Sequence, residues 1–253
     1  MRDILKSKEH FDILLDKYAG AIKVNIDCIN SGNMSQRKIE QANLRNIGLK
    51  IDSMTVQYSM GLDFSNIRIS LIDIIEDMKR FWSSEGNKVT SKNGIKLNQY
   101  LLEPYQKFLK VLSLAYLLNV SDNYLQVLID ILDKDNISDN LFEVIIKARF
   151  PDRINTENET YDKTHSIILK NYNNLRKATQ SKKKEDSIKL IKEYLKKDFY
   201  NKYMLGFKTH LGAAVFYCGY WSFEAATIVK IMGIDDSSFI NHKYYPKDLV
   251  HNI

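Results

Sequence analysis

The stretch "HFDILLDKYAGAIKVNI", His10 to Ile26, sets the expectation for the fold. Its apolar residues recur mostly at intervals of three and four: Phe11, Leu14, Leu15, Tyr18, Ile22 and Ile26. This spacing places them on one face of an α-helix, which another element must then cover. The sequence "NSGN" follows at 30–33, and Gly32 suits the left-handed conformation that ends many helices. We therefore predict an amphipathic helix that ends near residue 30.

The helical pattern continues through the rest of the chain. We expect helices over residues 35–58 and 64–82, a polar surface loop at 83–94, and two or three packed helices over residues 97–150. Further helices are expected at 166–178, 182–200, 205–217 and 220–232. The chain has only 3 Pro and 10 Gly, and Pro104 belongs near a helix start or at a kink. These features predict an all-α, multi-helix bundle.

The polar segment at 150–164 is the best candidate for an internal boundary, because it carries Pro151 and is nearly free of aliphatic residues. We therefore expect two packed helical modules, residues 1–150 and residues 151–253. At 253 residues and 44% hydrophobic content, the chain can bury a sizeable core.

The two cysteines and the hydropathy pattern indicate the cellular compartment of the protein. Cys28 and Cys218 lie far apart and outside any metal-binding spacing, which favours a reducing compartment over a disulfide framework. The N-terminus carries charges every few residues, and no run of about 18 uncharged apolar residues follows. We expect a cytoplasmic protein without membrane contact.

The formal net charge of +6 is concentrated in the C-terminal part. Residues after Pro151 hold 17 of the 37 Lys and Arg but only 12 of the 31 Asp and Glu. The lysine-rich segment Lys182–Lys197 could form a nucleic-acid-binding stripe. However, Ile188, Ile191, Leu195 and Phe199 line one face, so most lysines lie on the opposite, solvated face. We favour a solvated surface and keep a helical nucleic-acid-binding protein as the alternative function.

Motifs for catalysis are missing from the sequence. The five histidines form no metal-spaced pair, and there is no phosphate-binding glycine loop or nucleophile motif. We expect no enzyme activity, no metal, no cofactor and no small-molecule substrate. Asp235 and Asp236 follow Gly233 and precede two serines, which suits the start of a short helix better than a metal site. A metal-dependent hydrolase using this pair and a histidine is a third, less favoured hypothesis.

Glu224 stands out in "GYWSFEAATIVKIMGIDDSS", residues 219–238. Apolar residues surround the helix expected at 220–232, so this carboxylate should be buried near the helix start. A buried charge needs a partner. His210, a basic residue or a tyrosine hydroxyl could supply it. We favour an internal anchor over a binding residue, and a binding residue over a catalyst.

These residues also carry a family resemblance. The segments "YWSFEAATIVKIMGIDDSSF" (220–239) and "HKYYPKDLVH" (242–251) resemble the C-terminal signature of the PoNi immunity proteins. The opening "MRDILKSKEHFD" (1–12) and the segment "LSLAYLLNVSDNYLQVLIDILDKDNISDNLFEVII" (112–146) resemble the N-terminal module of the same family. The likeness covers nearly the whole chain, although Lys247 stands where the family usually has an aromatic residue.

The resemblance implies a non-enzymatic, cytoplasmic, α-helical inhibitor. It would bind a cognate PoNe-type DNase toxin delivered by a contact-dependent bacterial secretion system and block it stoichiometrically, as a monomer or as a homodimer. PoNe toxins resemble the PD-(D/E)xK nucleases, whose active sites hold acidic metal ligands. The shared motif implies a structural role for Tyr220, Trp221, Phe223, Glu224, Asp235, Asp236, Tyr244, Tyr245, Pro246 and Asp248.

A DNase needs basic groups for the phosphate backbone, so an inhibitor gains rate and specificity by presenting acids. The densest acidic stretch, opposed within it by Lys134 alone, predicts a toxin contact at Asp130, Asp133, Asp135, Asp139 and Glu143. The competing interpretation is a solvated helix-turn-helix with Asp and Ser caps. Alternatively, the basic C-terminal half could face the acidic active site of the nuclease.

Overall fold

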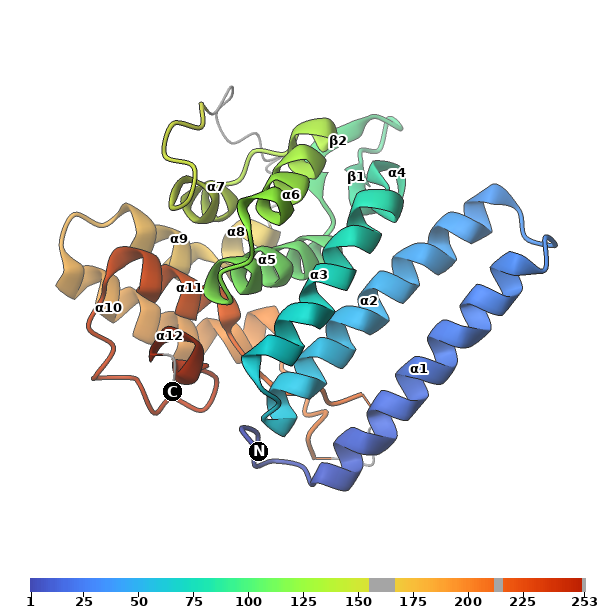
Figure 1. Ribbon diagram of the computed structural model, residues 1–253. Coiled ribbons are helices and arrows are strands. Elements are labelled where there is room, and N and C mark those ends of the chain that lie inside the picture. Colours follow the sequence, from blue (N-terminus) through green and yellow to red (C-terminus); the bar gives the residue numbers. More distant parts are fainter. Residues whose placement is uncertain (155–166, 212–215, 252–253) are drawn as a thin grey trace. The chain divides into compact units, whose positions relative to one another are not determined.

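The computed structural model describes residues 1–154, 167–211 and 216–251 (Figure 1). These residues form an all-α protein, apart from one two-stranded hairpin. The chain divides into two compact units. Unit 1 comprises Met1–Asn87 and Lys208–Gly219, and unit 2 comprises Lys88–Phe207 and Tyr220–Ile253. Pro151 lies within unit 2, and the division into modules 1–150 and 151–253 stays a prediction.

Unit 1 is built on three long helices: α1 (Lys8–Asn30), α2 (Gln36–Met60) and α3 (Phe64–Phe81), followed by the short α4 (Ser84–Asn87). Helix α2 packs against α1 and α3 as antiparallel neighbours (Figure 1). The predicted face of α1 is buried at Phe11, Leu14 and Tyr18, but Ile26 is 45% exposed. The apolar face is therefore covered only in the first half of α1.

Left-handed glycines follow α1 and α2, and the sequence indicates the first of them, Gly32. Gly32 has a φ of 70° just beyond α1, and Gly61 caps α2 with a φ of 86°. Both values lie where residues with a side chain are strained. The turns are therefore short, and successive helices fold back on each other.

The predicted loop at 83–94 and the helical start at residue 97 are wrong in part. Strands β1 (Lys88–Thr90) and β2 (Lys96–Tyr100) form an antiparallel hairpin that pairs Lys88 with Tyr100 and Thr90 with Lys96. An Asn-Gly turn joins them, and Gly94 has a φ of 78°. Asn-Gly between short strands is a typical hairpin turn, a signal that the helical pattern downstream obscured.

Unit 2 packs around α5 (Leu102–Leu117), whose first turn contains Pro104, as predicted. Contacts with α5 are made by α6 (Asp122–Asp135), α7 (Asn140–Lys147), α8 (Ile167–Asn171) and α11 (Phe223–Met232). Beside these lie α9 (Asn173–Gln180), α10 (Lys184–Glu193), the π-helix η2 (Tyr194–Tyr203) and α12 (Lys247–His251). The core includes Phe108, Leu112, Leu132, Phe142 and Phe199.

The helix predicted at 205–217 is wrong for the described part of that range, which forms only turns and irregular chain at 205–211 and 216–217. Leu205 and Gly206 have φ values of 53° and 63°, and two successive left-handed residues cannot continue a helix. Residues 212–215 of that prediction, and 155–164 of the predicted boundary, lie outside the described residues.

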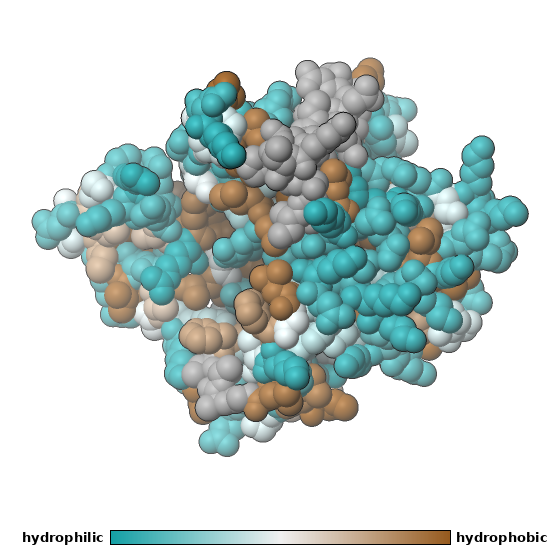
Figure 2. Space-filling model, turned by 180° about the vertical axis from the view of Figure 1, so that it is seen from behind, coloured by the Kyte–Doolittle hydropathy of each residue, from teal (hydrophilic) through white to brown (hydrophobic). Residues whose placement is uncertain are grey.

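Within the described ranges, no helix has both the length and the apolar character needed to cross a membrane. Hydrophilic residues cover much of the face shown in Figure 2, with hydrophobic residues in smaller areas between them.

Candidate functional site

The predicted acidic stretch divides into buried and exposed residues. Asp135, Asp139 and Glu143 are buried, whereas Asp130 and Asp133 are exposed on α6. The amphipathic character of α6 causes part of this division: Asp130 and Asp133 lie three residues apart on its solvent face, and Asp135 lies on its buried face. Asp139 is buried as the N-cap of α7, and Glu143 is buried in its first turn. A partner could reach Asp130 and Asp133 directly, and the binding role of all five acids stays a prediction.

Asp139 joins several elements of unit 2. Its carboxylate caps α7 by accepting hydrogen bonds from the backbone N–H groups of Leu141 (2.8 Å) and Phe142 (3.2 Å). It also accepts from the Tyr105 hydroxyl at 3.1 Å and pairs with the Arg176 guanidinium at 2.7 Å. Asp135 similarly accepts the Tyr100 hydroxyl at 2.6 Å. These contacts explain why the two acids tolerate burial.

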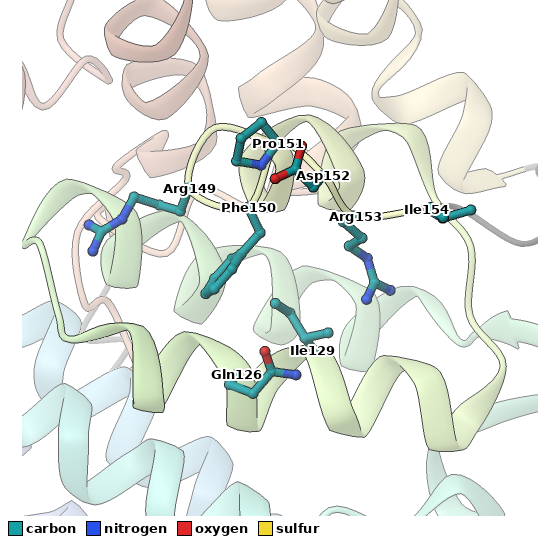
Figure 3. Close-up of a pocket in the computed structure, with 8 residues that line it drawn as sticks. All are labelled: Gln126, Ile129, Arg149, Phe150, Pro151, Asp152, Arg153 and Ile154. Carbon is teal, nitrogen blue, oxygen red and sulfur yellow. The ribbon is translucent and has the colours of Figure 1, made fainter.

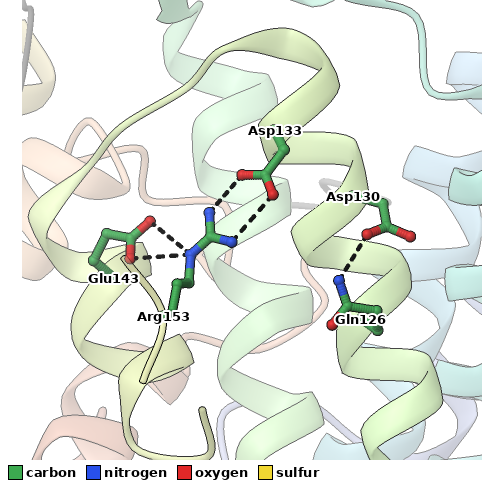
Figure 4. A network of polar contacts seen from close by, with 5 residues as sticks. All are labelled: Gln126, Asp130, Asp133, Glu143 and Arg153. Carbon is green, nitrogen blue, oxygen red and sulfur yellow. Dashed lines mark hydrogen bonds and ion pairs between the residues drawn. The ribbon is translucent and has the colours of Figure 1, made fainter. Parts of the chain in front are cut away.

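Arg153 lies between Asp133 of α6 and Glu143 of α7 (Figure 4). Its Nη1 is 3.1 Å from Asp133 Oδ2, and its Nε is 3.3 Å from Glu143 Oε2. Burial raises the pKa of Glu143, although the charge of Arg153 opposes that shift. The hydrogen bond to Asp133 raises the pKa of Arg153, so the guanidinium stays charged. This arginine ties the segment after α7 to α6.

One face of α6 presents polar residues at helical spacing: Asp122, Gln126, Asp130 and Asp133. Arg149 pairs with Asp122, and Arg153 pairs with Asp133. Gln126 donates a hydrogen bond to Asp130 at 2.7 Å. Gln126 is neutral, and the described residues give Asp130 no cation as a partner. Asp130 therefore adds to this face of α6 a negative charge that is not compensated.

A pocket of about 520 Å³ opens beside the same face of α6 (Figure 3). Gln126 and Ile129 line it from α6, and residues 149–154 line the other side. The side chains of Phe150 and Ile129 point toward one another between the two arginines. The floor is thus apolar and the rim charged, a composition typical of protein-binding surfaces.

Glu224 is only 2% exposed, as expected, and its partners are hydroxyls. Its carboxylate accepts hydrogen bonds from the Tyr194 hydroxyl at 2.6 Å and from Ser222 Oγ at 2.8 Å. Burial raises the pKa of Glu224, and these hydrogen bonds only partly offset that effect. The contact joins α11 to η2. The anchoring role itself stays a prediction.

Aromatic residues of the C-terminal motif form one cluster. The Tyr244 ring stacks on Tyr200 at 5.7 Å between centroids and meets Phe199 at 5.3 Å and Tyr220 at 6.0 Å. The Tyr220 hydroxyl donates to the carbonyl of Phe207 at 2.7 Å. Phe223, Tyr245 and Pro246 are also buried, and Trp221 is half-buried. This packing holds the C-terminal segment against η2.

The Asp235–Asp236 pair has two different environments. Asp235 is exposed and accepts the backbone N–H of Ser237 at 2.9 Å, which lowers its pKa. Asp236 is buried, accepts the Tyr245 hydroxyl at 2.8 Å and contacts His251 Nε2 at 2.8 Å. The residues that follow form turns rather than the short helix we predicted. Asp248 lies half-buried in the first turn of α12.

The basic segment behaves as its hydrophobic pattern predicts. Ile191, Leu195 and Phe199 are buried, and Ile188 is half-buried. The lysines are exposed: Lys182, Lys183, Lys184, Lys189, Lys192, Lys196 and Lys197. Lys192 and Lys196 line a second pocket together with the loop at 237–242.

Sequence reasoning missed the buried Arg176 that pairs with Asp139, and it allowed a tyrosine hydroxyl as the partner of Glu224 without naming Tyr194. Arg176 and Tyr194 each occur in amphipathic segments without a local motif. A signal did exist for Arg176: it is flanked by Leu175 and Ala178, so it shares the buried face of α9. An arginine at a core position implies a buried acid nearby.

Comparison with known protein families shows to which family this chain belongs. The N-terminal model of the PoNe immunity proteins (PoNi) matches residues 6–130, and the C-terminal model of PoNi matches residues 137–249. The chain belongs to the PoNi family. It therefore has an immunity role, for which the family implies a toxin protein as partner.

A solved structure shares the fold of this chain. The crystal structure of protein PA2201 from Pseudomonas aeruginosa matches with a TM-score of 0.64 at 13% sequence identity, over 99% of this chain and 89% of that one. At this identity the likeness shows the fold alone. No curated protein matches the chain.

Proposed function

We propose that this PoNi chain binds a cognate PoNe-type DNase toxin stoichiometrically and occludes its active site. The match to both family models, over residues 6–130 and 137–249, carries this proposal. Occlusion requires no chemistry from the inhibitor, because an interface that excludes DNA is sufficient. The toxin would arrive through a contact-dependent secretion system and meet the inhibitor in the cytoplasm.

The exposed acids of α6 support a contact with a DNA-binding enzyme. A nuclease surface that binds phosphates carries positive charge, and Asp130 and Asp133 offer negative charge beside an apolar pocket. Complementary charge accelerates association, and an apolar pocket next to it supplies desolvated contact area. Asp135, Asp139 and Glu143 would then position this face through their internal bonds.

Co-expression of this chain with a candidate PoNe-type nuclease from the same genome tests the proposal. We expect host survival and a complex of the two proteins that co-purifies. Undiminished toxicity, with both proteins expressed in folded form, would contradict it.

A charge reversal then tests the contact surface. Asp130→Lys is the cleanest change, because Asp133→Lys would also break the ion pair with Arg153. We expect Asp130→Lys to slow association with the toxin by about tenfold at low salt, with a smaller effect at high salt. Glu185→Lys, an exposed acid on α10, is the matched control. Equal effects of the two reversals would place the contact elsewhere.

The alternative function, nucleic-acid binding, rests on one observation. Lys182, Lys183 and Lys189 are exposed and make no ion pair with a residue that the structure describes. Binding to duplex DNA that weakens steeply as salt increases, and that is lost on reversal of these lysines, would favour this function.

A further inference from the structure

The pocket between the basic helix and the loop that follows α11 is distinct from the acidic face of α6. It has a volume of about 290 Å³ and lies within unit 2. Lys192, in the last turn of α10, and Lys196, in the first turn of η2, line one wall. Residues 237–242 line the other wall. The two lysines are four residues apart, so their ammonium groups act on the same space.

The positive charge of this pocket is not neutralised by its own lining, which contains no Asp or Glu. Lys192 and Lys196 are exposed and form no ion pair within the described ranges. The nearby Glu193 instead pairs with Lys197 at 3.3 Å. Asp235, at the edge of the loop, accepts the backbone N–H of Ser237 and forms no ion pair with either lysine within the described ranges. The pocket therefore keeps the charge of both lysines.

The opposite wall adds hydrogen-bond donors. Ser238 contributes a hydroxyl, whereas the Ser237 hydroxyl is hydrogen-bonded to Asp235. Asn241 Oδ1 accepts from Lys247 Nζ at 2.8 Å, so the amide NH₂ of Asn241 is left to donate. His242 Nδ1 accepts the backbone N–H of Tyr244 at 3.4 Å, and burial lowers the pKa of this histidine. A neutral His242 then carries its proton on Nε2 and is a further donor.

Both walls are held by the fold. The Asp236 carboxylate accepts a hydrogen bond from the Tyr245 hydroxyl. The backbone carbonyl of Asp236 accepts another from the N–H of Phe239 at 2.8 Å. The Phe239 ring packs edge-on against Tyr245 at 5.2 Å. The wall formed by Lys192 and Lys196 spans the junction of α10 with the π-helix η2, a rare conformation that often marks functional sites. The pocket is thus preformed, with its positive charge and hydrogen-bond donors held in place by the fold.

The size and lining favour a protein carboxylate over a nucleic acid. A single-stranded nucleic acid is bound along a groove with exposed aromatic rings for its bases. Here Phe239 is only 6% exposed and its ring belongs to the core. We propose that this pocket receives an Asp or Glu side chain from an acidic surface of the partner toxin. This inference rests on the proposed function and adds a second contact, of opposite charge to the α6 face.

The test measures binding of this chain to the cognate nuclease, inactivated by substitution, with the double variant Lys192→Glu/Lys196→Glu. We expect its Kd to rise by about 10- to 1000-fold, since the double reversal replaces two positive charges with two negative ones that repel the incoming carboxylate. The neutral variant Lys192→Gln/Lys196→Gln should show a smaller loss. The matched control is Lys182→Glu/Lys183→Glu, which makes the same change of net charge outside the pocket lining. Its Kd should stay within about threefold.

The outcomes separate this proposal from the proposed function. Wild-type chain that fails to bind the nuclease would overturn both. Wild-type binding with equal affinity for the pocket variant, or equal losses in the pocket and control variants, would overturn the pocket alone. Loss of duplex DNA binding in the pocket variant, with toxin binding intact, would overturn it in favour of a nucleic-acid site. A thermal unfolding midpoint unchanged from wild type would show that the variants are folded.

Discussion

Arg176 donates a hydrogen bond to Asp139 at 2.7 Å inside unit 2, where the side chains are 8% and 0% exposed. The pair joins α9 to the start of α7, and Asp139 also caps α7 and accepts the Tyr105 hydroxyl. Removing one partner leaves the other charge buried. The acid that sequence reasoning assigned to a surface is thus a central polar contact of this unit.

Arg176→Met should lower the free energy of unfolding of unit 2 by about 3–5 kcal/mol, because Asp139 would lose its charged partner. Urea unfolding followed by circular dichroism measures this. Glu103→Gln is the control, since it breaks an exposed pair with Lys107 in the same unit and should cost at most about 1 kcal/mol. Equal losses in the two variants would show that the buried Arg176–Asp139 pair stabilises the unit no more than an exposed ion pair does.

Glu224→Gln should change stability in a pH-dependent way. Burial raises the folded-state pKa of Glu224 above 4.5, so the fold favours the protonated carboxyl. The resulting stability is present below the ordinary pKa and is lost as the pH rises through the raised value. Gln resembles the protonated form and cannot ionise. The stability of the variant relative to wild type should therefore increase from pH 4 to pH 8, as measured by urea unfolding. A constant difference across this range would contradict the prediction.

Asp236→Ala should loosen the C-terminal segment. The Tyr245 hydroxyl and His251 would lose their acceptor, at a cost of about 1–3 kcal/mol. Thermal unfolding and the rate of limited proteolysis near residue 245 measure the effect. Asp235→Ala removes the neighbouring, exposed carboxylate and should have a smaller effect on both measurements. A larger effect of Asp235→Ala than of Asp236→Ala would show that Asp235 anchors the C-terminal segment.

Gly61→Ala and Gly20→Ala should act in opposite directions. Gly61 has a φ of 86°, and an added Cβ would lie 3.3 Å from Met1 Cα and Met1 N, so the variant should lose more than about 1 kcal/mol. Gly20 lies inside α1 with nothing within 4 Å of an added Cβ, so alanine there should gain about 0.5–1 kcal/mol. Melting temperatures of the two variants provide the measurement. A gain for Gly61→Ala would exclude strain at this cap.

The helices were predictable where the pattern is local. Phe11, Leu14 and Tyr18 mark α1 by spacing alone, and Gly32 marks its end by its freedom in the left-handed region. The β-hairpin was missed because its turn is short and a strong helical pattern follows it. The helix expected at 205–217 failed because Leu205 and Gly206 turn the chain, which hydrophobic content does not reveal.

The sequence by itself determined the helical class, the buried environment of Glu224 and the family, because each depends on residue spacing or on a long shared motif. Only the tertiary structure decided which acids face solvent and which cations they meet. Asp130 and Asp139 look alike in the sequence, yet one lies on the outer face of α6 and the other beside Arg176. The physical reason is that a charge takes its role from the groups packed around it, and Arg176 lies 37 residues from Asp139 along the chain.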